Sequence, residues 1–172
     1  VLSTTIASNT SDFGGGILND GRLTLIGGSV LSNTADAGGG LNNFSVATIS
    51  GTSFAGNAAT YVGGGVSNYG PTSGGLSELT IQAASFISNT ADLGGGLYNS
   101  GHLTLTTSLF AGNTVTDTQF GSGGGLANTS AGLNQLPFTA LISGTTFQRN
   151  AAAVDGGGLV NFDRSLELVN VD

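Results

Sequence analysis

Apolar residues in this chain recur in short alternating triplets rather than in long runs or helical stripes. Each triplet carries an apolar residue at its first and third positions. The triplets are LTL (23–25), ATI (47–49), LTI (79–81), LTL (103–105), ALI (140–142) and LEL (166–168). Strict alternation predicts β-strands with one buried face, and the frequent glycines and the missing 3.6-residue period argue against helix.

A longer repeat frames these strands. Each unit has an apolar residue followed three positions later by Asn, then a triple glycine, then an apolar residue two positions before a second Asn. The first asparagine column comprises Asn9, Asn33, Asn57, Asn89, Asn113 and Asn150, and the second comprises Asn19, Asn43, Asn68, Asn99, Asn128 and Asn161. The basic period is 24 residues, from Asn9 to Asn33.

Short strands with Gly and Asn corners in a 24-residue unit predict one coil of a right-handed parallel β-helix. Residues 1–172 would form a single all-β domain of about six to seven coils. Equivalent side chains then stack in columns, and Leu23, Leu25, Phe54 and Leu41 each represent one inward column. Gly suits corners that need positive φ or close backbone approach. We interpret both Asn columns as structural, because Asn tolerates the left-handed region, bonds its own backbone and forms amide ladders between coils.

The two ends of the chain fall within a coil. Val1 occupies the repeat position of Leu25, and Leu168 occupies it again. Solenoids need terminal caps to cover the open core and the strand edges. We therefore expect uncapped ends, belonging to an excerpt of a longer β-helix or to a unit that binds copies of itself end to end.

Charge and composition exclude several classes. The formal net charge is −7, and the cations are Arg22, Arg149 and Arg164, with no lysine. Nucleic-acid binding needs a basic surface, which this chain lacks. It contains no cysteine, and therefore no disulfide framework or thiolate metal site. No apolar run is long enough to span a bilayer, so we expect no membrane insertion by this segment.

The sequence predicts no catalytic, cofactor or metal residues. GGGL lacks the lysine of a phosphate-binding loop. Asp12, Asp36 and Asp92 share one register and leave a calcium site as an alternative, although calcium needs six or more oxygen ligands. Glu78 and Glu167 lie on distant coils, and His102 stands alone before its strand. The outward threonines of the triplets leave ice binding as a minor alternative.

Insertions interrupt the repeat at residues 69–78, 114–122 and 129–138. Insertions in a solenoid become loops, often on the binding face. Four aromatic residues within or near them are the candidate partner contacts: Tyr61, Tyr69, Phe120 and Phe138.

The paired motifs, Phe-x-x-Asn followed by Gly-Gly-Gly and Leu, Ile or Val, resemble the polymorphic outer membrane protein repeats of chlamydial and other bacterial surface proteins. Ile6 and Val30 stand where Phe is usual. The resemblance implies a pectin-lyase-like β-helix, a secreted or cell-surface location and an adhesive passenger stalk without enzymatic activity. Its partner would be a ligand on a host or neighbouring cell. The alternative is a non-catalytic segment of a β-helical polysaccharide lyase or hydrolase whose catalytic coils lie outside this segment.

Overall fold

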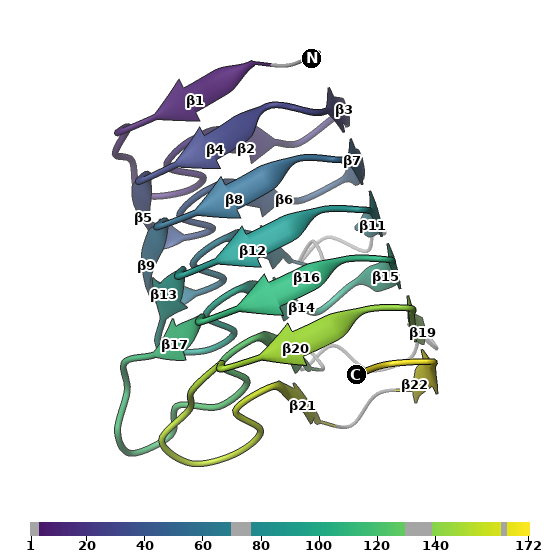
Figure 1. The fold of residues 1–172 in the computed structure, drawn as a ribbon. Helices are drawn as coiled ribbons and strands as arrows, with labels where there is room; N and C mark the ends of the chain where they lie inside the picture. Colours follow the sequence, from purple (N-terminus) through teal and green to yellow (C-terminus); the bar gives the residue numbers. More distant parts are fainter. Residues whose placement is uncertain (1–3, 70–76, 130–138, 163–164) are drawn as a thin grey trace.

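The computed structural model describes residues 4–69, 77–129, 139–162 and 165–172. Throughout these residues the regular elements are β-strands, arranged in four sheets with parallel pairing. The chain passes through the sheets in turn, so each strand pairs with its equivalents one coil before and one coil after (Figure 1). This arrangement confirms the predicted parallel β-helix. In the described part of the chain there is no helix of the length and apolarity that a membrane crossing requires.

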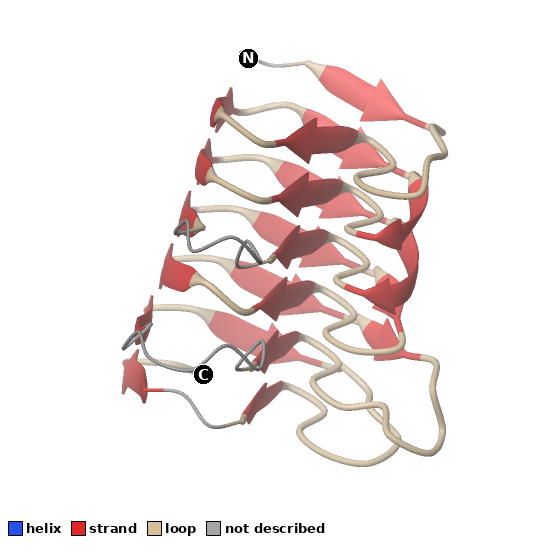
Figure 2. Cartoon of the chain, turned by 180° about the vertical axis from the view of Figure 1, so that it is seen from behind, coloured by secondary structure: helices blue, strands red, loops and turns tan. Residues whose placement is uncertain are grey.

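Two sheets contain the strands around the second asparagine column. Sheet D follows the triple glycines and consists of β2 (Ile17–Asn19), β6 (Leu41–Asn43), β10 (Val66–Asn68), β14 (Leu97–Asn99), β18 (Leu126–Asn128) and β21 (Leu159–Asn161). Sheet A contains the alternating triplets and consists of β3 (Arg22–Ile26), β7 (Val46–Ser50), β11 (Glu78–Gln82), β15 (His102–Thr106), β19 (Thr139–Ser143) and β22 (Ser165–Val169). The same stacking is seen from behind in Figure 2.

The other two sheets lie on either side of the first asparagine column. Sheet B consists of β1 (Thr5–Ala7), β4 (Ser29–Leu31), β8 (Ser53–Ala55), β12 (Ser85–Ile87), β16 (Leu109–Ala111) and β20 (Thr146–Gln148). Sheet C consists of β5 (Thr34–Ala37), β9 (Ala58–Val62), β13 (Thr90–Ala91) and β17 (Thr114–Val115). The sequence pattern did not predict sheet C as a separate sheet.

The core is the set of inward columns that the repeat predicts. Phe54, Phe86 and Phe110 are fully buried and stack ring on ring, with centroids 5.3 and 4.3 Å apart. Phe147 continues the stack at 4.9 Å. β22 is the last described strand of sheet A, and its inward residue Leu168 is 51% exposed. The outward threonines of sheet A, such as Thr80 and Thr104, are exposed as the alternation predicts.

Both asparagine columns form amide ladders that run from coil to coil. In the first, Asn57 Nδ2 donates to Asn89 Oδ1 at 3.0 Å and to the carbonyl oxygen of Val30 at 2.9 Å. In the second, Asn68 Nδ2 donates to Asn99 Oδ1 at 2.7 Å. Both predicted ladders are therefore confirmed, and their interior members are buried.

The structural role of these asparagines does not use the left-handed conformation that Asn tolerates, because none of the twelve has positive φ. Positive φ occurs instead at the residue just before each first-column asparagine: Ser8, Ser32, Gly56, Ser88, Gly112 and Arg149. The physical reason is that an Asn in the ladder must direct its amide inward between coils, so the preceding residue makes the turn. The triple glycine behaves as predicted: Gly94 has φ +64, and a Cβ on Gly95 would lie 2.6 Å from the carbonyl oxygen of Gly124.

Candidate functional site

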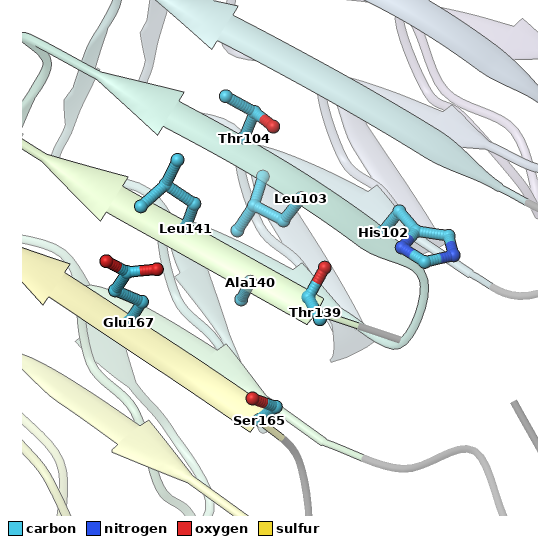
Figure 3. A pocket seen from close by; sticks show the side chains of 8 residues that line it. All are labelled: His102, Leu103, Thr104, Thr139, Ala140, Leu141, Ser165 and Glu167. Carbon is cyan, nitrogen blue, oxygen red and sulfur yellow. The ribbon is translucent and has the colours of Figure 1, made fainter. Parts of the chain in front are cut away.

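The outer face of sheet A carries the ionisable residues nearest to a catalytic arrangement. A shallow depression of about 330 Å³ crosses β15, β19 and β22, and its lining residues include His102, Thr139 and Glu167 (Figure 3). Glu78 and His102 are register partners on β11 and β15. The prediction that His102 stands alone is therefore wrong, because the residues just before the aligned triplets LTI (79–81) and LTL (103–105) are neighbours on adjacent strands.

The two glutamates of this face lie too far apart to act as a glycosidase pair. Glu78 lies on β11 and Glu167 on β22, and β15 and β19 separate these strands. Three steps of about 4.8 Å put them at least about 14 Å apart, whereas such pairs need roughly 5–9.5 Å. The pair on this face whose side chains could transfer a proton is therefore Glu78 and His102, on adjacent strands.

The aspartates of the calcium alternative lie two residues before a triple glycine, and Asp36 is part of β5 in sheet C. Asp12 and Asp36 are exposed on adjacent coils, and the N–H of Asp36 donates to the backbone oxygen of Asp12 at 2.9 Å. Asp92 accepts a hydrogen bond from the Thr116 hydroxyl at 2.6 Å. Among the described residues, no three His, Asp or Glu side chains come together in a group that could hold a metal ion.

An aromatic groove lies across the outer face of sheet D. Its volume is about 360 Å³. It is lined by Phe13, Ala37, Asn42, Phe44, Tyr61, Val62 and Tyr69. We call these seven residues the aromatic groove. One side comes from the corner before the triple glycines and carries Phe13 and Tyr61, which are 53% and 61% exposed. The other side comes from the residues that follow second-column asparagines, Phe44 and Tyr69.

The rings of the groove form a row that follows the axis of the solenoid. Phe13 and Phe44 have centroids 6.3 Å apart, and Phe44 and Tyr69 are also 6.3 Å apart. Tyr98 extends the row on the next coil, 6.1 Å from Tyr69, and its hydroxyl lies 3.0 Å from the Thr129 Oγ1. These distances are typical of interacting aromatic pairs.

Of the described residues that line the groove, Asn42 is the one with a side-chain amide. It lies at the centre of β6, and its register partners on β2 and β10 are Leu18 and Ser67. The side chain is 1% exposed, and in the described part of the chain neither its Nδ2 nor its Oδ1 has a hydrogen-bond partner. Buried polar groups are normally paired, and leaving one unpaired costs about 1–3 kcal/mol.

A β-bulge explains why Tyr61 points outward. The register between β5 and β9 shifts between Ala35 and Ala37, so β9 has one residue more than β5. Five residues lie between Asn57 and Gly63 along the chain, whereas four lie between Asn33 and Gly38. Bulges re-aim side chains and are frequent near functional sites.

The candidate contact residues fall into three groups. Tyr61 and Tyr69 meet in the aromatic groove. Phe120 is 77% exposed on the 114–122 insertion and does not line the groove. Phe138 lies outside the described residues, as do most of the 69–78 and 129–138 insertions.

Phe13, Phe44 and Asn42 are the site residues that sequence reasoning missed. One signal was available, because Phe44 and Tyr69 occupy the same repeat position, directly after a second-column asparagine.

Comparisons of the chain with protein-family models, with curated proteins and with solved structures returned no match.

Proposed function

We propose that this chain is a non-enzymatic β-helix of an extracellular or cell-surface protein, acting as a stalk that presents an adhesive surface. The observation that carries the proposal is that structural and contact roles fall on different positions of each coil. The asparagine ladders and inward columns hold successive coils together along the axis. The aromatic groove lies on the outer face, and its residues belong neither to the asparagine ladders nor to the inward columns.

Three further features support a secreted or surface role. The repeats resemble those of bacterial surface proteins. The net charge of −7 and the absence of lysine suit a soluble stalk. Exposed aromatic side chains in a groove are typical of recognition surfaces rather than of a scaffold alone.

The proposal is tested with beads coated with the full chain and passed over surfaces covered with cells or with plant or bacterial polysaccharides. We expect beads carrying the folded chain to be retained, and beads carrying the heat-unfolded chain to wash off. Equal retention of both preparations would overturn the adhesive role.

A segment of a carbohydrate-active enzyme is the second candidate, because Glu78 and His102 occupy adjacent strands of one face. It predicts new reducing ends or unsaturated products when the chain is incubated with polysaccharides. Loss of that product in the E78Q variant would establish the enzyme and overturn the proposal of a non-enzymatic stalk.

A further inference from the structure

We infer that the aromatic groove binds a neutral saccharide, with Asn42 at its floor hydrogen-bonding a sugar hydroxyl. The inference rests on the proposed function and names the ligand class of its adhesive surface. The ligand would be an uncharged oligosaccharide or polysaccharide lying along the row of rings.

The chemistry of the groove matches the two kinds of surface that a sugar ring offers. The C–H faces of a pyranose are apolar and pack against aromatic rings, while its hydroxyls both donate and accept hydrogen bonds. Phe13, Phe44, Tyr61 and Tyr69 supply the rings. An amide has two donors and one acceptor oxygen. Asn42, with both polar atoms free, can therefore serve a hydroxyl in either direction.

The charge around the groove selects against other ligands. Among the described residues that line the groove, none is Asp, Glu, Lys, Arg or His. Asp12 and Asp36 immediately precede the lining residues Phe13 and Ala37 and are exposed. This acidic margin repels uronates, phosphates and nucleic acid, so the occupant is a neutral sugar.

Access to Asn42 requires a side chain on the rim to move. Phe13 and Tyr61 are the most exposed aromatic residues of the groove, so they can rotate with little loss of packing. The unpaired amide is also dispensable for folding, because the equivalent position holds leucine in β2 and alanine in β18. Its presence here is explained by a ligand rather than by the scaffold.

Tyrosine fluorescence offers a direct probe of this site. The chain has three tyrosines and no tryptophan. Tyr61 and Tyr69 line the groove, and Tyr98 packs against Tyr69. The full chain is titrated with neutral hexasaccharides of glucose, mannose, galactose and xylose, and with hexagalacturonate as the charged control. We expect saturable changes with at least one neutral sugar and none with hexagalacturonate.

Two variants separate binding from stability. N42L should weaken binding about tenfold by removing one hydrogen bond while raising the unfolding midpoint. S67A is the matched control, because Ser67 is also buried with an unpaired hydroxyl but does not line the groove. It should leave affinity unchanged. If N42L fails to fold, Y61S at an exposed position should give the same loss of affinity.

The outcomes test the saccharide assignment and the adhesive function separately. If no neutral hexasaccharide binds at concentrations up to about 10 mM, the saccharide assignment is overturned, and bead retention decides separately whether the adhesive function stands. Binding that N42L and Y61S leave intact, or binding of hexagalacturonate alone, also overturns the assignment to this groove.

Discussion

Removing the amide of Asn57 tests whether the first asparagine ladder holds the coils together. Its Oδ1 accepts from the backbone N–H and from the Nδ2 of Asn33, both at 3.0 Å. Its Nδ2 donates to Val30 at 2.9 Å and to Asn89 at 3.0 Å. The substitution N57A removes these four bonds from a fully buried site. At about 1 kcal/mol net for each bond, the expected loss is about 4 kcal/mol.

Asn9 provides the matched control at the exposed end of the same ladder. Its side chain donates to Asn33 Oδ1 at 2.9 Å, and its backbone N–H, which the substitution retains, donates to the same oxygen. N9A should therefore cost about 1 kcal/mol or less. Urea unfolding followed by circular dichroism gives both values. Equal losses in N9A and N57A would refute the ladder as a source of stability.

The charged variant N57D adds a test with a defined sign. A carboxylate oxygen would replace the donor that faces the oxygens of Val30 and Asn89. Burial beside acceptors raises the pKa of the introduced carboxyl in the folded state above its unfolded value of about 3.9. The folded state then binds more protons, so stability relative to the parent chain falls as pH rises through that raised pKa. A destabilisation independent of pH would contradict this account.

Three further predictions concern other columns, each measured by urea unfolding. F110A should cost about 3–5 kcal/mol, because the ring is fully buried within the phenylalanine stack; a loss below 1 kcal/mol would contradict a packed stack. T107G should stabilise the fold by about 0.5 kcal/mol, because glycine relieves the strain of φ +49 at this position. G112A should cost about 1 kcal/mol, because Gly112 has φ +63. A destabilised T107G together with a stabilised G112A would refute backbone strain. G95A should cost about 3 kcal/mol or more, because its Cβ would lie 2.6 Å from a carbonyl oxygen, whereas G21A meets no atom within 4 Å and should be tolerated.

The sequence predicted the features that every coil repeats. The spacing of Asn33 to Asn57 equals one coil, so stacking and the amide ladder followed from counting residues. Leu79 and Ile81 alternate with outward residues, which identified the buried face of sheet A. These predictions succeeded because a solenoid turns sequence period directly into spatial neighbours.

The repeat pattern did not predict sheet C or the aromatic groove. Sheet C was missed because its buried residues, such as Ala35 and Ala91, are small and short strands show no apolar alternation. The groove was missed because it joins Phe13, Asn42 and Tyr61 from three coils at different repeat positions. Only the tertiary arrangement brings such residues together.

The outer position of sheet D shows how function can be added to this scaffold without disturbing it. That position holds leucine in β2, asparagine in β6, serine in β10 and alanine in β18, so the fold accepts very different side chains there. The inward columns and the asparagines beside it supply the stability. An apolar residue in β6 would remove the unpaired amide at no cost to the ladder. Asn42 is therefore a stability cost of the kind that binding sites carry, which supports the proposed role of the outer face as the contact surface.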